Sequence, residues 1–91
     1  MTDEQILEML KSNLDKTTSV KDDYLKFLID ASKEKIAEEG ITLDLSKSGD
    51  VNLVVMYAAY LFRKRAEDNP VMPRMLRYAL NNRLFSEKMK S

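Results

Sequence analysis

The stretch from residue 51 to residue 62 constrains the fold most, because every residue in it except Asn52 is apolar. As a helix, such a stretch is apolar on nearly every side, and a helix of that kind is buried on several faces. A chain of 91 residues has room for one small domain. The sequence therefore predicts a central helix over about residues 51–67. Whatever short partner helices leave uncovered must be covered by an extended segment of the chain or by a neighbouring subunit.

Two helices are expected before this central one. The first begins at Thr2 or Asp3 and ends near Asn13, and after a polar connection the second is capped by Ser19 and stopped by Gly40. Helical spacing selects their buried positions: Ile6, Leu7, Leu10 and Leu14 in the first helix, and Leu25, Leu28, Ile29, Ser32 and Ile36 in the second, with Tyr24, Phe27 and Ala31 widening that stripe.

Residues 41–45 alternate apolar and polar side chains, which is the period of an extended segment. We expect this segment to cross the helices as a strap, with Ser48 or Asp50 capping the central helix after it. Pro73 suits the first position of a fourth helix that runs to about Leu84.

The predicted fold class is therefore all-α, a small bundle of about four helices with one extended crossing segment. Residues 1–85 are expected to form a single helical domain, and residues 86–91 a flexible C-terminal tail.

The composition argues against catalysis. The chain has no histidine and no cysteine, so it lacks the usual acid–base group, the thiol nucleophile and the commonest metal ligands. It also lacks a phosphate-binding Gly-Lys-Ser/Thr loop. We predict no enzyme activity, no catalytic residues, no cofactor and no metal. The acidic N-terminus is unlike a signal peptide and no apolar run is long enough to span a bilayer, so no membrane partner is expected.

Charge is divided unevenly along a chain of zero net charge. Residues 1–50 carry 12 acids and 7 bases, whereas residues 51–91 carry 3 acids and 8 bases, which include all five arginines. A subunit with one acidic and one basic part can attract copies of itself head to tail.

The arginine-rich segment predicts an interface, because guanidinium groups suit carboxylates and phosphates. The predicted interface residues are Arg63, Arg65, Arg74, Arg77, Tyr78 and Arg83. Beside the arginines runs an apolar stripe, which is expected to pack the last helix onto the central one and is alternatively an adaptable docking face: Met72, Met75, Leu76, Ala79 and Leu80. Tyr57, Tyr60 and Phe62 are expected in the core rather than as a base-stacking platform.

Several segments together resemble a known family. They are a short acidic leading helix, the second helix with its glycine stop, Asp-Asp-Tyr-Leu-Lys-Phe-Leu-Ile-Asp-Ala-Ser-Lys-Glu-Lys-Ile at 22–36, the long aromatic and alanine-rich helix that ends Leu61-Phe62-Arg63, and the closing run at 72–85. This closing run, Met-Pro-Arg-Met-Leu-Arg-Tyr-Ala-Leu-Asn-Asn-Arg-Leu-Phe, is the most specific part. Over almost the whole chain the pattern is similar to the head–tail connector (head-completion) proteins of tailed bacteriophages and prophages.

The resemblance implies a virion structural protein without enzymatic activity, present in the host cytoplasm during assembly. Its partners would be about twelve copies of itself in a closed ring, the portal protein above it and a tail-side connector or stopper protein below. Double-stranded DNA would pass through the lumen without sequence reading. An isolated subunit would stay monomeric or form an open array until the portal templates the ring. Two alternatives remain open, a small helical nucleic-acid-binding module and a plain protein-interaction adaptor.

Overall fold

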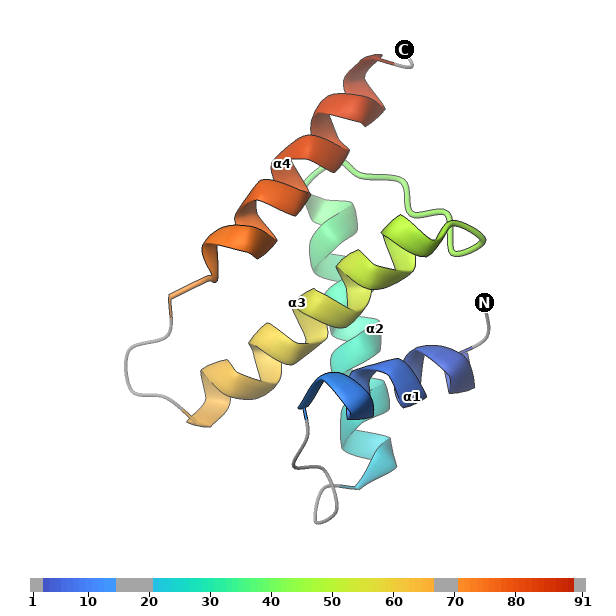
Figure 1. Ribbon diagram of the computed structural model, residues 1–91, viewed down its shortest axis with the longest axis vertical. Coiled ribbons are helices and arrows are strands. Elements are labelled where there is room, and N and C mark those ends of the chain that lie inside the picture. The colour runs from blue at the N-terminus through green and yellow to red at the C-terminus, as the bar shows by residue number, and fades with distance from the viewer. Residues whose placement is uncertain (1–2, 15–20, 67–70, 90–91) are drawn as a thin grey trace.

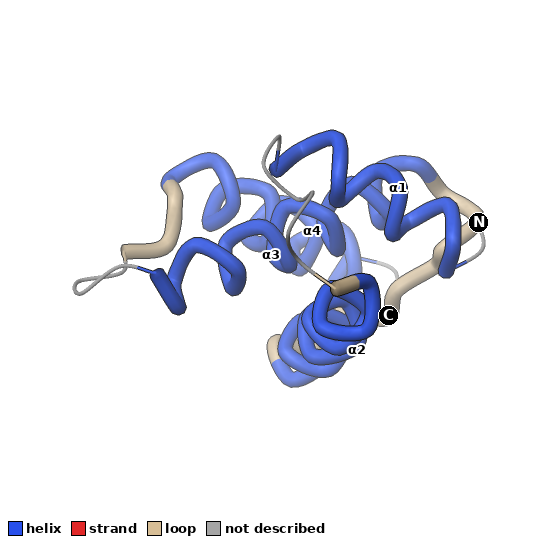
Figure 2. Tube along the Cα trace, turned by 90° about the horizontal axis from the view of Figure 1, so that it is seen from below, coloured by secondary structure: helices blue, strands red, loops and turns tan. Residues whose placement is uncertain are grey.

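The computed structural model describes residues 3–14, 21–66 and 71–89, which form four helices (Figure 1). They are α1 (Asp3–Leu14), α2 (Asp22–Glu38), α3 (Ser48–Ala66) and α4 (Arg74–Met89). The described residues contain no strand, so the predicted all-α class is confirmed. In Figure 2, α2 lies on one side and the other three helices lie against it and beside it.

The central position of α3 is confirmed, since it packs against each of the other three helices. Val51, Leu53, Val54, Val55, Tyr57, Ala58 and Ala59 are all buried. Met56, Tyr60, Leu61 and Phe62 are partly buried and packed against the same core. A single copy of the chain thus covers most of the apolar surface of α3, which removes the need for a neighbouring subunit to do so.

The strap is part of that cover. Ile41 is buried, and Leu43 and Leu45 are partly buried against the core, while Thr42 and Asp44 between them are exposed. The predicted alternation of inward and outward side chains is confirmed, and Figure 1 shows the segment arching from the end of α2 to the start of α3.

The buried stripes of α1 and α2 are confirmed at every predicted position, including the polar Ser32. Ser32 is accommodated because its Oγ donates to the backbone carbonyl of Leu28 at 2.7 Å. Phe27, predicted to widen the stripe, is instead 64% exposed on the outer face of α2. The ring of Tyr24, by contrast, lies 6.4 Å from that of Phe62 between centroids.

Several helix ends differ from prediction. The N-cap of α2 is Lys21, which makes no side-chain cap bond, and the acidic Asp22 and Asp23 occupy the first turn, where they favour the helix dipole. Ser19, predicted to be this cap, and the connection around it lie outside the described residues. Gly40 has a φ of 98°, a conformation that suits glycine, and the predicted stop there is confirmed.

Asp50 lies within the first turn of α3 rather than capping it. Pro73 directly precedes α4, and its carbonyl accepts the Arg77 N–H at 3.1 Å. At the other end, α4 continues to Met89, so the prediction of a loose tail is wrong for residues 86–89. Residues 90–91 lie outside the described part. The helix is longer because Glu87 in its last turns is held by contacts to the strap and to Arg83.

Candidate interaction surface on the fourth helix

The inner face of α4 packs on the body of the protein. Leu76 and Leu80 are each only 1% exposed, and Met72, Ala79 and Leu84 are partly buried against the core. The predicted packing of this stripe is confirmed for four of its five members. Met75 is the exception, because it is 75% exposed.

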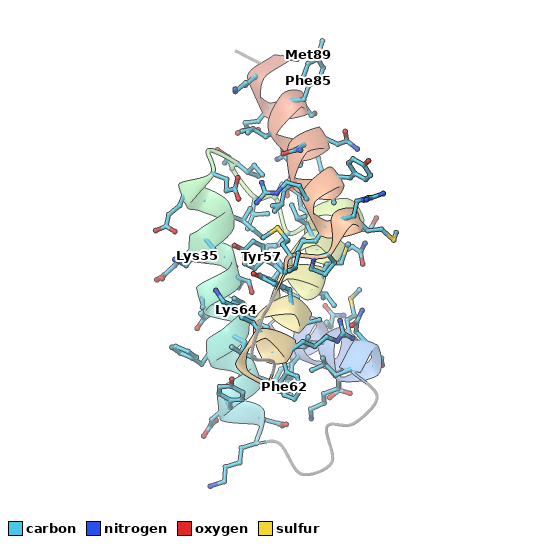
Figure 3. The ribbon with its side chains drawn as sticks, turned by 90° about the vertical axis from the view of Figure 1, so that its left-hand side faces the viewer. Lys35, Tyr57, Phe62, Lys64, Phe85 and Met89 are labelled. Atoms are coloured by element: carbon cyan, nitrogen blue, oxygen red, sulfur yellow. The ribbon has the colours of Figure 1, made fainter. Side chains whose placement is uncertain are left out.

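The outer face of α4 carries a second apolar row. Its members are spaced at helical intervals, so they lie along one side of the helix, and they are 59–75% exposed: Met75, Tyr78, Phe85 and Met89. We call these four residues the outer row. Figure 3 shows Phe85 and Met89 near the free end of α4, away from the other helices. The exposed Asn81 and Asn82 divide the row into two apolar pairs, Met75 with Tyr78 and Phe85 with Met89. Exposed apolar side chains grouped on one side of a helix are typical of an interaction site.

The arginines of this helix have different environments. Arg83 is turned inward, with its side chain only 15% exposed. Its Nε donates to Asp50 Oδ1 at 2.8 Å, and its Nη1 donates to Glu87 Oε2 at 3.0 Å. Its Nη2 donates to the Thr42 carbonyl at 2.7 Å. We call Thr42, Asp50, Arg83 and Glu87 the Arg83 cluster, and it ties the strap and the start of α3 to α4.

The ionisation of the cluster is fixed by these contacts. Burial alone would raise the pKa of the Asp50 carboxyl, but hydrogen bonds from Arg83 and from the Asp44 backbone N–H bring that pKa below its ordinary value. Hydrogen bonds from Thr42 and then from Arg83 lower the pKa of Glu87. The same two carboxylates raise the pKa of Arg83. All three groups are therefore charged at neutral pH, and Arg83 stabilises the fold.

Arg77 also has an intramolecular partner. It faces Glu39 at the end of α2 through two long contacts, Nη1 to Oε1 at 3.3 Å and Nη2 to Oε2 at 3.5 Å. This ion pair and the one between Arg83 and Asp50 each join an acid of the first half of the chain to a base of the second half. The charge separation seen in the sequence is partly neutralised inside one subunit.

The other predicted interface residues point outward or are not described. Tyr78 belongs to the outer row, and Arg63 and Arg74 are exposed and make no ion pair with the described residues. Arg65 belongs to α3, but its side chain lies outside the described part. The structure therefore leaves Arg63, Arg74 and Tyr78 open to a partner, while Arg77 and Arg83 already bind carboxylates.

A groove runs between α3 and α4 beside the outer row. Its two depressions, of about 310 and 200 Å³, share Met56 on their floor. The first is lined by Gly49, Asp50, Asn52, Leu53, Met56, Ala79, Asn82, Arg83 and Ser86. The second is lined by Asn13, Met56, Ala59, Arg63, Pro73, Met75 and Leu76.

Sequence reasoning missed Glu87 and Asp50 as partners of Arg83, Phe85 and Met89 as members of the outer row, and the exposure of Phe27. Glu87 has a detectable signal, because it follows Arg83 by four residues on a helix. Asp50 has none, since its contact with Arg83 spans 33 positions. Phe27 is three or four residues from none of the buried positions of α2, so helical spacing itself could have placed it on the outer face.

Comparisons of the chain with protein-family models, with curated proteins and with solved structures find no significant match. Among the described side chains, no three acids gather in a way that could hold a metal ion. None of the helices in the described ranges is long and apolar enough to cross a membrane.

Proposed function

We propose that this protein is a non-enzymatic structural subunit of the head–tail connector of a tailed bacteriophage or prophage. In this proposal it forms a ring beneath the portal and joins the DNA-filled capsid to the tail-side connector or stopper protein. The proposal combines the resemblance of residues 22–36, 61–63 and 72–85 with one structural observation. That observation is the outer row of α4, four large apolar side chains that no described part of the chain covers.

The outer row supports a protein partner better than a nucleic acid. It is apolar, whereas phosphate binding depends on free cations along a surface. Of the three arginines on α4, Arg77 and Arg83 already contact carboxylates of the same chain. We therefore assign Tyr78, Phe85 and Met89 of the outer row to contact with the portal or a tail-side protein.

The plain adaptor remains the second candidate, for a specific reason. Because a single copy covers most of α3, the chain does not need neighbours to complete its core. A monomer that folds alone and exposes one apolar row on α4 would also suit an adaptor. The two functions differ in oligomeric state once the portal is present.

The experiment mixes the purified chain with the portal ring of the same phage and follows the complex by light scattering and negative-stain electron microscopy. The connector proposal expects a ring of density added beneath the portal. Phe85→Asp should weaken this binding by about tenfold or more, because it places a charge in an apolar contact. Ser12→Asp adds the same charge to an exposed position on α1 and is the matched control. A portal that stays bare in the presence of the unmodified chain contradicts the proposal.

Nucleic-acid binding is tested separately with a gel shift at low salt. The connector proposal expects no shift of short duplex DNA at protein concentrations where the portal complex is complete. A shift that weakens steeply with salt, with a slope of roughly −0.9 for each phosphate contacted, would favour the nucleic-acid-binding module instead.

A further inference from the structure

The outer face of α2 carries an isolated aromatic side chain among acids. Phe27 is 64% exposed. Asp23 precedes it by four residues and Asp30 follows it by three, so both lie one helical turn from it on the same face. Glu34 lies one turn further along that face. This group of residues, Asp23, Phe27, Asp30 and Glu34, is called the α2 knob below.

The acids of the knob differ from the other acids of the protein. Asp23, Asp30 and Glu34 are exposed, and none makes an ion pair or hydrogen bond with the described residues. The acids elsewhere whose side chains are described are engaged. The carboxylates without a partner therefore gather around the one large apolar side chain that α2 exposes.

The complementary features lie at the groove between α3 and α4. Its depression of about 200 Å³ has an apolar lining that includes Met56, Ala59 and Met75, and Arg63 stands at its edge. Arg74 is exposed and stands in the chain between Pro73 and Met75, which both line this depression. Methionine side chains adapt well to an aromatic ring. The two arginines whose described side chains lack a carboxylate partner are thus beside an apolar groove.

Charge reinforces this match. Residues 22–39 carry six acids and three lysines, whereas residues 63–77 carry five cations and two acids. The opposite charges flank the apolar part of each surface, which is the arrangement that fixes register in a protein interface. Phe27 cannot enter the groove of its own chain, because α2 packs on α3 through its opposite, buried face.

We propose that the α2 knob of one subunit docks in the α3/α4 groove of a second copy of this chain. Phe27 enters the groove against Met56 and Met75, and the knob acids meet Arg63 and Arg74. Knob and groove are different surfaces, so the contact is head to tail and repeats from copy to copy, closing into a ring or growing as an open array. This contact deepens the proposed function, and closure of the copies into a ring rests on that function. Tyr78, Phe85 and Met89 of the outer row stay free for the portal.

Disulfide trapping tests the contact, because the natural chain contains no cysteine and every bridge must come from introduced positions. The full-length variants Phe27→Cys and Met75→Cys are mixed at high concentration under mild oxidation. The mixed 27–75 dimer should exceed the 27–27 and 75–75 dimers. The control is Phe27→Cys mixed with Phe85→Cys, since Phe85 is equally exposed on α4 but does not line the groove. A 27–75 yield equal to the 27–85 yield overturns the proposal.

Charge exchange gives a second, independent measurement on the complete chain. Arg74→Glu should weaken self-association by about tenfold, because it places like charges together across the contact. Adding Asp30→Arg to the same chain should restore the association. No change on reversal, or no restoration in the double variant, counts against the docking.

These outcomes separate the two proposals. If the trapping fails while the portal still acquires a ring, the knob–groove contact is wrong and the connector function stands. If the 27–75 bridge forms while the portal stays bare, the copies pair as inferred and the connector function is wrong.

Discussion

The exposure of helices α3 and α4 is the opposite of what their compositions suggest. Helix α3 is apolar on nearly every side, yet the chain covers most of its apolar surface. Helix α4 is far more polar, yet it exposes Met75, Tyr78, Phe85 and Met89 to solvent. The number of apolar side chains on a helix therefore does not indicate where a partner binds. The position of the neighbouring helices decides which apolar side chains remain uncovered.

The largest expected effect tests the burial of α3. Val54 is fully buried, so Val54→Asp places an unpaired charge in the core and should cost at least about 3–5 kcal/mol of unfolding free energy. That is a large part of the roughly 5–15 kcal/mol that holds a domain together. Urea unfolding followed by circular dichroism measures it.

Asn52→Asp, at an exposed position of the same helix, is the control and should change stability by less than about 0.5 kcal/mol. At protein concentrations too low for copies to associate, the unfolding midpoint of the natural chain should also be independent of concentration, because the cover of α3 comes from one copy. A midpoint that rises with concentration would show that other subunits contribute to it and would break the comparison.

The two faces of α4 give the next largest difference. Leu80→Ala removes buried contacts and should cost about 2–5 kcal/mol. Phe85→Ala removes a larger side chain from the same helix but an exposed one, and should change stability by less than about 0.5 kcal/mol. The same urea titrations compare them. Equal losses would mean that the outer row packs on the protein after all.

The Arg83 cluster is the main polar attachment of α4. Arg83→Met leaves the buried Asp50 carboxylate without its partner and should cost about 2–4 kcal/mol. The double variant Asp50→Leu with Arg83→Met removes both charges and should recover part of that loss. A double variant no more stable than the single one would indicate that packing of the Arg83 side chain, rather than its charge, holds α4 in place.

The cluster also predicts how stability depends on acid. The pKa values of Asp50 and Glu87 are lower in the folded chain than in the unfolded one, so their contribution is complete above the unfolded values of about 4. The contribution declines as the pH falls through the folded values. Unfolding free energies measured between pH 6 and pH 2.5, a range chosen around those values, should fall less steeply for Arg83→Met than for the natural chain. Equal pH profiles would contradict the assignment.

The sequence predicts the local features of this fold well. Helical spacing identifies the buried positions of α1 and α2, and the alternation at 41–45 predicts the strap, because each depends on side chains close together in the chain. The two errors have different causes. Phe27 is three or four residues from none of the buried positions of α2, so the spacing itself places it on the outer face. Met75 is four residues from Ala79, and only the position of α3 leaves it exposed.

The same limit applies to the candidate site. Five arginines gathered in one segment direct attention to α4 and the end of α3, but composition cannot show which of them already binds a carboxylate of the same chain. Arg83 meets Asp50 only because the strap brings the start of α3 beside α4. The outer row contains Tyr78 from the predicted set, while Phe85 and Met89 become visible only when the helix is seen to continue past residue 84.

The smallest expected effect compares the two arginine pairs of α4. The contacts of Arg77 with Glu39 are 3.3–3.5 Å long and its side chain is 43% exposed, so solvent weakens the attraction. A double-mutant cycle with Arg77→Met and Glu39→Gln should give a coupling free energy of about 0.2–1 kcal/mol. The cycle for Arg83 and Asp50 should give a larger value. If the two couplings are equal, Arg77 holds α4 as firmly as Arg83 does, and it is no more available to a partner.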